Sequence, residues 1–202
     1  DPLAFMAEVV EINQIELLTS HRMAWTSLLG ETPRASFFHT LDWLQAYWRH
    51  FGHDQKLRVL VVKAAGKTIG IVPLCVRTEQ RQYGNLRVLT YPLENWGTWY
   101  SPLGGNQAAT LHLAMKHIAQ TPRDWDMIDL PWVDHDVTDR GRTTRALQAA
   151  DLAFNLQPDA VSEAIKIEGD WEDYRATLGS KLRSEIRRAL RRGSQIGEVS
   201  YI

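Results

Sequence analysis

One segment near the middle of the chain, ENWGTWYSPLGG (Glu94–Gly105), gathers side chains that could bind a ligand. Its aromatic rings offer flat faces on which a sugar or another ring can stack, and its amide side chain can form hydrogen bonds. Loops usually run over the protein surface, so aromatic residues on a loop favour a binding role. The alternative is that they fold back over a sheet edge as a local core. The candidate ligand-binding residues are Asn95, Trp96, Trp99 and Tyr100.

Carboxylates that could act as a general base lie in the same half of the chain. Glu94 is a weak candidate because it opens the aromatic loop. Four aspartates follow in two short runs, one flanking an apolar segment and one in a polar loop. For these four, solvation or helix capping is the more ordinary role. They are Asp126, Asp129, Asp134 and Asp136.

Other kinds of site fail on residue spacing. AAGKT (residues 64–68) lacks the earlier glycine of a phosphate-binding loop and joins two expected strands rather than a strand and a helix. His50 and His53 are separated by a helix-ending glycine, Gly52, and no Cys or third His stands near them. The sequence therefore predicts no metal site.

The composition is that of an ordinary globular protein. The 202 residues carry a net charge of −1 and are 44% hydrophobic, which gives no overall attraction to nucleic acid or anionic lipid. The lone cysteine, Cys75, cannot form an internal disulfide, so a reducing compartment and a cytoplasmic location are expected. Its apolar neighbours predict a buried thiol. No apolar run approaches the roughly 18 residues of a membrane span.

Near its end the chain carries a strongly basic helix, expected over residues 180–195 with Ser180 as its cap. Six basic residues against Glu185 give it a net charge of +5, while the rest of the chain has −6. A narrow apolar stripe runs along it, with Leu182, Ile186 and Leu190 at helical spacing. Three roles are open: a connector packed by its stripe, a contact to phosphate or acceptor, and a contact to RNA. The basic residues are Lys181, Arg183, Arg187, Arg188, Arg191 and Arg192.

The order of expected elements predicts an α/β fold. Strands are expected at residues 7–12, 56–64, 67–77, 85–91, 125–132 and 162–168, with the second and third forming a hairpin. Helices are expected at residues 14–29, 40–52, 106–120, 143–152 and 170–178. Interleaved strands and helices around a central hairpin indicate a mixed sheet flanked by helices. The change to successive polar helices places a domain boundary between residues 168 and 169.

The order of these features resembles a known family. SFFHTLDWLQAYWRHFG, LRVLVVKAAGKTIGIVPLCVR, LRVLTYPLENWGTWYSPLGG, WDMIDLPWV and WEDYRATLGSKLRSEIRRALRRG together resemble GNAT-like acetyltransferases of the CelD/BcsL group, distant relatives of the Fem peptidyltransferases. The resemblance runs from about Ser36 to the end. Members look like two GNAT-type halves in tandem, which implies that residues 1–168 are the first half. Residues 169–202 would then be the connector and the first strand of a second, truncated half.

The resemblance implies an acyl-CoA-dependent N-acyltransferase acting on a sugar, polysaccharide-precursor or peptidoglycan-type amine. Acetyl-CoA or another acyl-CoA would bind in the second half, which the Lys181–Arg192 helix would contact. A GNAT cofactor site needs a Gly-rich turn at a helix N-terminus, whereas TEQRQYGNLRVLTY has only Gly84 and runs into a strand. No cofactor-binding residue is therefore predicted in this chain. The alternatives are a Fem-like enzyme that uses charged tRNA, the one case for nucleic acid, and a non-catalytic scaffold.

Overall fold

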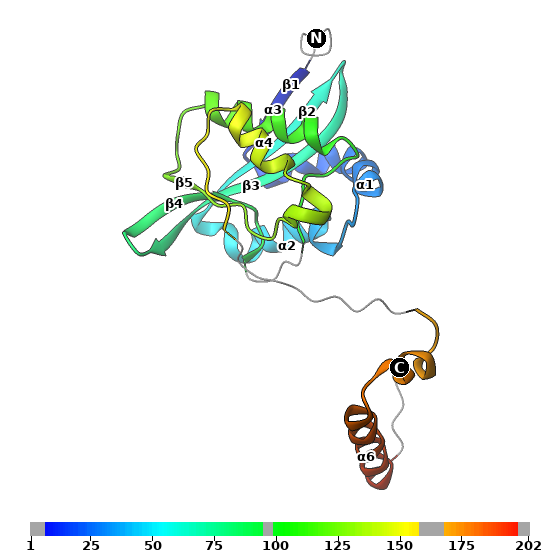
Figure 1. Cartoon of the computed structure of the whole chain (residues 1–202). Helices are drawn as coiled ribbons and strands as arrows, with labels where there is room; N and C mark the ends of the chain where they lie inside the picture. The colour runs from blue at the N-terminus through cyan, green and yellow to red at the C-terminus, as the bar shows by residue number, and fades with distance from the viewer. Residues whose placement is uncertain (1–6, 95–98, 158–167, 198–202) are drawn as a thin grey trace. The chain divides into compact units, whose positions relative to one another are not determined.

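The computed structural model describes residues 7–94, 99–157 and 168–197. The chain divides into two compact units, Asp1–Gln157 and Pro158–Ile202. The first unit holds the sheet and most of the helices, and the second holds two helices (Figure 1). The boundary that the sequence places between residues 168 and 169, and the assignment of residues 169–202 to a second GNAT-like half, stay predictions.

The helices and strands follow in chain order. They are β1 (Ala7–Ile12), the 3-10 helix η2 (Ile15–His21), α1 (Arg22–Glu31), the 3-10 helix η3 (Phe37–His39), α2 (Leu41–Phe51), the 3-10 helix η4 (Gly52–Asp54), β2 (Lys56–Ala64), β3 (Lys67–Arg81), β4 (Gly84–Thr90), α3 (Gln107–Gln120), β5 (Met127–Ile128), the π-helix η6 (His135–Asp139), α4 (Arg142–Ala149), α5 (Trp171–Thr177) and α6 (Ser180–Ile196).

The strands of the first unit form one mixed sheet in the order β1-β2-β3-β4-β5. The first four pair antiparallel, and β5 pairs parallel to β4 after the crossover through α3. A parallel pair requires such a crossover, because the chain must return to the same end of the sheet. The predicted α/β fold, a mixed sheet flanked by helices, is confirmed.

The turn between β2 and β3 confirms the predicted hairpin. Ala65 and Gly66 both have positive φ, at 49° and 77°. This is the pattern of a type I′ turn, whose twist matches that of the two strands it joins. Glycine adopts such a φ without strain, whereas the alanine does so at some cost.

Two apolar layers cover the two faces of the sheet. Along β2 and β3 successive side chains point to opposite faces, as the period of two requires. Leu60 and Val72 belong to the cluster with α3 and α4, while Val61 and Ile71 belong to the cluster with α1 and α2. Figure 1 shows α3 and α4 on the near face of the sheet. The central strands are therefore buried on both sides, which explains their almost continuous apolar sequence.

Cys75 lies in this central region on β3 and is fully buried, as predicted. Burial raises the pKa of its thiol to about 12, with smaller effects from neighbouring charges. The thiol is therefore protonated at neutral pH and acts as a small hydrophobic side chain.

One ion-pair network is buried at the edge of the sheet. The guanidinium of Arg58, 2% exposed as a residue, donates to both carboxylate oxygens of Glu11 at 2.8 Å and to Asp124 at 3.0 Å. His117 lies 2.9 Å from Glu11. The network links β1, β2 and the end of α3 to the segment before β5, and a buried guanidinium is tolerated only with such partners.

Three local expectations differ from the structure. The helix expected at residues 14–29 is a 3-10 helix followed by α1. The strand expected at residues 125–132 reduces to Met127–Ile128, because the chain then turns away to form other contacts. The N-cap of α6 is Gly179 rather than Ser180, and Ser180 is the first helical residue. Residues 162–167 of the last expected strand lie outside the described residues.

The described part of the second unit consists of α5 and α6. Asp170 caps α5 by accepting from the backbone N–H of Asp173, as the sequence predicts. Neither helix has a buried residue, and on the apolar stripe of α6 Leu182 and Leu190 are 47% and 61% exposed. Among the described residues, no helix is long and apolar enough to cross a membrane.

The Arg58 network generates a prediction about acid stability. Burial alone would raise the pKa of Glu11, but hydrogen bonds from Arg58, Asn13 and His117 outweigh it and lower the pKa to about 2. Because the folded-state pKa lies below the unfolded value, the stabilisation is complete above about pH 4.5 and is lost as the pH falls toward 2. We expect Glu11→Gln to lower the free energy of unfolding by about 3 kcal/mol at pH 7. Urea denaturation should show this difference shrinking to about half at pH 3. A difference that stays constant between these pH values would contradict the assignment.

Candidate functional site

The carboxyl ends of β4 and β5 are the place to look for a ligand site. In open α/β sheets, ligands bind in the crevice beyond the carboxyl ends of parallel strands, where the direction of connection changes. Here β4 and β5 are the parallel pair, and they join through Val88–Met127 and Leu89–Ile128. The long connection from β4 to α3 contains the aromatic loop.

The chain returns into this crevice before α3 begins. Leu103 pairs with Ile71 of β3, with N–H to O distances of 2.9 and 3.2 Å. On the other side, the backbone N–H of Tyr100 donates to the carbonyl of Trp132, beyond β5, at 2.9 Å. The segment Tyr100–Leu103 is buried and acts as a short inserted strand. We call it the return segment.

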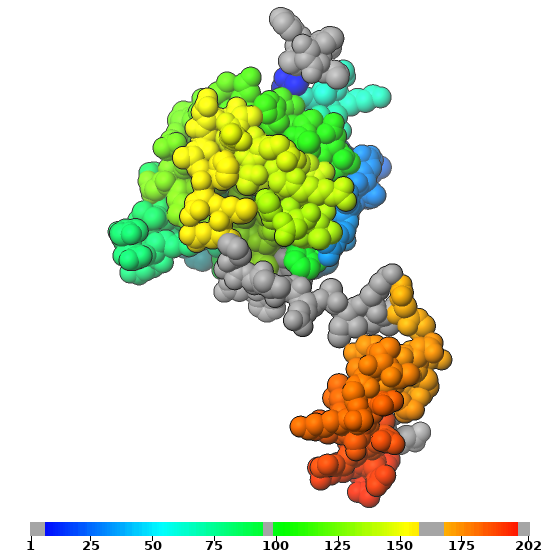
Figure 2. All heavy atoms as spheres, viewed as in Figure 1, coloured from blue at the N-terminus to red at the C-terminus, as the bar shows by residue number. Residues whose placement is uncertain are grey.

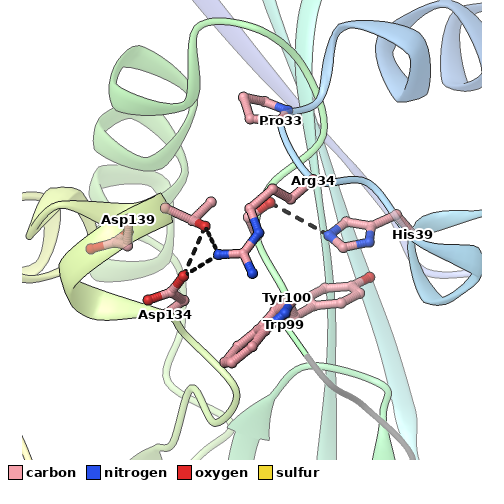
Figure 3. Close-up of a pocket in the computed structure, with 9 residues that line it drawn as sticks. Pro33, Arg34, His39, Trp99, Tyr100, Asp134 and Asp139 are labelled. Carbon is pink, nitrogen blue, oxygen red and sulfur yellow. Dashed lines mark hydrogen bonds and ion pairs between the residues drawn. The ribbon is translucent and has the colours of Figure 1, made fainter. Parts of the chain in front are cut away.

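Beside the return segment lies a very small cleft, about 10 Å³ in volume and partly open to solvent. Its centre is Arg34, in the loop after α1 (Figure 3). The Arg34 guanidinium lies over the ring of Trp99, 4.9 Å from the ring centre. One guanidinium nitrogen donates to Asp134 at 2.6 Å and to Thr138 at 3.1 Å. The lining residues are Pro33, Arg34, His39, Trp99, Tyr100, Ser101, Asp134, Thr138 and Asp139.

The two aspartates of the cleft also organise its backbone. Asp134 caps η6 by accepting from the backbone N–H of Val137 at 3.3 Å, so the capping role expected for it is confirmed. Asp139 is 6% exposed and accepts from both the N–H and the hydroxyl of Thr143. The carboxylates are therefore fixed in place before any ligand arrives, as a recognition site requires.

The opposite wall is built on His39 and Ser101. The His39 ring stacks on Tyr100 with ring centres 4.7 Å apart. Its Nδ1 accepts from the backbone N–H of Ser36 at 3.1 Å, so the proton of the neutral ring is on Nε2, which faces the Ser101 hydroxyl at 3.4 Å. In that tautomer the ring donates toward the serine and cannot take its proton. His39 is therefore a structural group here rather than the base of a nucleophilic serine.

Several residues around the cleft have strained backbone. Arg34, Trp132 and Arg140 have φ of 56°, 65° and 52°, in the left-handed region that non-glycine residues rarely adopt. For a residue as bulky as Trp132 this conformation is exceptional, and it directs the carbonyl that receives the Tyr100 N–H. Strained conformations persist only where the surrounding structure holds them, and they gather at functional sites.

The structure places the predicted acceptor residues in different environments. Trp99 is half-buried at the cleft beneath Arg34, and Tyr100 is buried, packed between His39 and Tyr91. Glu94 does not line the cleft, because its carboxylate accepts from Arg77 at 3.0 Å. Asn95 and Trp96 lie outside the described residues.

The other predicted acids serve as ion-pair partners. Asp126 accepts from the Arg87 side chain, and Asp129 accepts from Arg81. Each ion pair helps to hold the strands at this edge of the sheet together. Asp136 is exposed beside His135. In the described part of the chain, no group of three or more His, Cys, Asp or Glu residues could hold a metal ion.

Sequence reasoning missed Arg34, His39, Ser101 and Asp139. Arg34 and Asp134 are 100 residues apart in the chain, so no local pattern links them. One signal was available: a positive charge next to a helix-ending proline, Pro33, shows that Arg34 stands in a loop. That signal does not say which carboxylate it meets.

The β4–α3 connection also tests whether an acyl-CoA would fit this unit. Its pyrophosphate would need free backbone N–H groups at the start of α3. The N–H of Leu103 already donates to Ile71, that of Gly104 to the Thr32 hydroxyl at 2.8 Å, and that of Ala109 to the Asn106 side chain. The return segment also occupies the crevice itself. These three N–H groups are not available to a pyrophosphate, so the connection fits the cofactor poorly.

Comparison with known proteins gives only distant similarities. No family model and no curated protein matches the sequence. Among solved structures, a possible acetyltransferase from Clostridium difficile 630 is 12% identical, with 78% of this chain and 99% of that chain covered and a TM-score of 0.41.

Two further solved structures are similar at the same level. The aminoglycoside acetyltransferase meta-AAC0020 from an uncultured soil metagenomic sample, in complex with trehalose, is 10% identical over 81% of this chain and 99% of that one, with a TM-score of 0.45. A ribosomal-protein-alanine N-acetyltransferase from Brucella melitensis biovar Abortus 2308 is 12% identical over 80% and 99%, with a TM-score of 0.38.

The tight fit of the return segment against β3 can be tested with two neighbouring glycines. A Cβ on Gly104, whose φ is +110°, would lie 2.6 Å from the backbone oxygen of Ile69. At Gly105 the nearest atom would be 3.7 Å away. We expect Gly104→Ala to lower the free energy of unfolding by about 3 kcal/mol and Gly105→Ala by less than about 1 kcal/mol, measured by urea denaturation. Equal effects would show that the return segment is not held as described.

His39 generates a second prediction, concerning pH. Burial lowers the pKa of His39 to about 4, so protons bind the unfolded state more readily than the folded one. The stabilisation is present above the unfolded pKa near 6.5 and is lost as the pH falls to 4, by about 3 kcal/mol. We expect His39→Asn to remove this loss, so that its unfolding free energy changes less between pH 7 and pH 4 than that of the unsubstituted chain. Parallel pH profiles for the two proteins would contradict it.

Proposed function

We propose that this chain is the acceptor-binding part of an acyl-CoA-dependent N-acyltransferase of GNAT type. The observation that carries the proposal is the cleft at the carboxyl ends of β4 and β5. It combines the aromatic ring of Trp99, one face of which is covered by the Arg34 guanidinium, with the Arg34–Asp134 ion pair. The order of antiparallel strands, crossover helix and parallel strand supports the GNAT-type assignment, which rests on the family resemblance.

The composition of the cleft suits an amine-bearing sugar. A sugar ring stacks on an aromatic face, and an ammonium group binds carboxylates. At about 10 Å³ the cleft is far smaller than the roughly 300–1,000 Å³ of usual small-molecule pockets. It would therefore take only one polar group of a polysaccharide-precursor or peptidoglycan-type acceptor, with the rest of the acceptor lying on the surface beside it. In such a reaction the enzyme holds the amine in place, a base removes its proton, and backbone amides polarise the thioester carbonyl.

In this proposal the acyl donor binds outside the first unit. The N–H groups of Leu103, Gly104 and Ala109 are already bonded, so acetyl-CoA or another acyl-CoA would bind a second half in contact with the Lys181–Arg192 helix. Glu94 remains a weak candidate base, since its carboxylate is bonded to Arg77. A cytoplasmic location remains an expectation from the single cysteine.

One rival function is supported by a specific observation. The filled crevice of the first unit is also what a non-catalytic scaffold would show. A Fem-like enzyme that uses charged tRNA has only the basic helix in its favour. Binding of an amine acceptor at the cleft separates the acceptor-binding proposal from the scaffold.

The test measures the binding of glucosamine to the 202-residue chain by saturation-transfer NMR. We expect weak binding that Trp99→Ala reduces at least about fivefold, because stacking on one aromatic ring is worth roughly 1 kcal/mol. Trp171→Ala is the matched control, because Trp171 is an exposed tryptophan of the other unit. N-acetylglucosamine, which lacks the amine charge, should bind less well. If neither sugar binds, or if both tryptophan variants behave alike, the acceptor role is lost.

A further inference from the structure

A second concave surface lies between α5 and α6, within the second unit. It has a volume of about 240 Å³, is broadly open to solvent, and is lined by Glu172, Arg175, Ala176, Arg183 and Arg187. Three of the five lining side chains are arginines. Figure 2 shows the two helices in orange and red in the space-filling view. This surface shares no residue with the Arg34 cleft.

Helical spacing explains why the arginines meet here. Arg183 and Arg187 are four residues apart on α6, so they lie one turn apart on the same face. Arg175 comes from α5, which the short Leu178–Gly179 connection joins to α6. Two helices in succession thus direct positive charge into one cleft. We call this set of three the arginine cleft.

Most of the positive charge in the arginine cleft is not neutralised by protein groups. Glu172 forms an ion pair with Arg175, one turn away on α5. Within the described residues, no acidic group lies within ion-pair distance of Arg183 or Arg187. Three arginines against one glutamate leave a net charge of +2. Like charges held together repel, so an anion would lower the energy of this arrangement.

We propose that the arginine cleft binds the diphosphate group of a small molecule. Guanidinium groups bind phosphoryl oxygens with paired, charge-assisted hydrogen bonds, and they are more weakly hydrated than ammonium groups. Two arginines one turn apart, with Cβ atoms about 5–6 Å apart, can each take one phosphoryl group of a diphosphate. A single phosphate would leave one of them unused. A net charge of +2 also balances the charge of a diphosphate diester.

The proposal concerns a different unit from the acceptor cleft and does not depend on the function proposed above. The diphosphate could come from a nucleotide sugar or from a nucleotide cofactor, since both carry the same group. RNA and anionic membranes would also be attracted to α6, but they would respond to its total charge. A ligand held in the arginine cleft would depend only on the arginines that line it.

The chain contains a matched control for this difference. Arg188 and Arg192 are also one turn apart on α6, but this pair starts five residues later, which places it about 140° around the helix. Neither lines the arginine cleft. Arg183→Gln with Arg187→Gln therefore removes the same charge from the same helix as Arg188→Gln with Arg192→Gln.

The experiment is a calorimetric titration of the 202-residue chain with inorganic pyrophosphate at about 0.15 M salt, where distant charges are largely screened. We expect the Arg183/Arg187 double variant to bind at least about tenfold more weakly, because each lost charge-assisted bond is worth about 1.5 kcal/mol or more. The Arg188/Arg192 double variant should stay within about twofold of the unsubstituted chain. Orthophosphate should bind about tenfold more weakly than pyrophosphate.

A gain-of-binding variant guards against loss of folding. Glu172→Gln removes the one negative charge of the cleft, so it should strengthen pyrophosphate binding several-fold, and circular dichroism checks that all variants keep their helices. ADP, UDP and coenzyme A in place of pyrophosphate then show which source of diphosphate is preferred. The proposal is overturned if pyrophosphate does not bind, or if orthophosphate binds as tightly as pyrophosphate. Equal weakening by the two double variants, as for RNA or vesicles, would also overturn it.

Discussion

The hydrogen bonds on both sides of the return segment are the constraint on which the rest of the first unit depends. Leu103 pairs with Ile71 on β3, and Tyr100 donates to Trp132 beyond β5. These bonds pair backbone groups within the crevice that would otherwise lack partners. They also set where α3 starts, and they hold Trp99 at the surface beneath Arg34. Without them neither the cleft nor its charged wall would have a fixed shape.

The sheet could be predicted from sequence because its signals are local. The apolar runs of β2 and β3, the short turn between them and the Thr40 cap of α2 each depend on neighbouring residues. The strand β5 could not be delimited, since its two residues are defined by pairing with β4 and not by their own pattern. The apolar residues that follow β5, up to Trp132, do not continue the strand. The carbonyl of Trp132 instead accepts a hydrogen bond from the return segment.

The candidate site was predicted only in part, for the same physical reason. An aromatic loop is visible in the sequence, and Trp99 does line the cleft. Arg34, whose guanidinium lies over the Trp99 ring, comes from the loop after α1, far from Trp99 in the sequence. Its ion pair to Asp134 spans 100 residues. Tyr100 illustrates the opposite outcome: the same composition that suggests a binding surface also suits a packed core, and its burial follows from the backbone pairing on either side of it.

The position of Cys75 has a consequence for how the motions of this protein can be followed. The chain has one thiol, and it lies fully buried on the central strand β3, between two layers of side chains. A thiol-specific reagent can reach it only when the sheet itself opens, whereas fraying at the ends of the chain leaves it covered. The rate of thiol modification therefore reports how often the core opens. No second cysteine contributes to the signal.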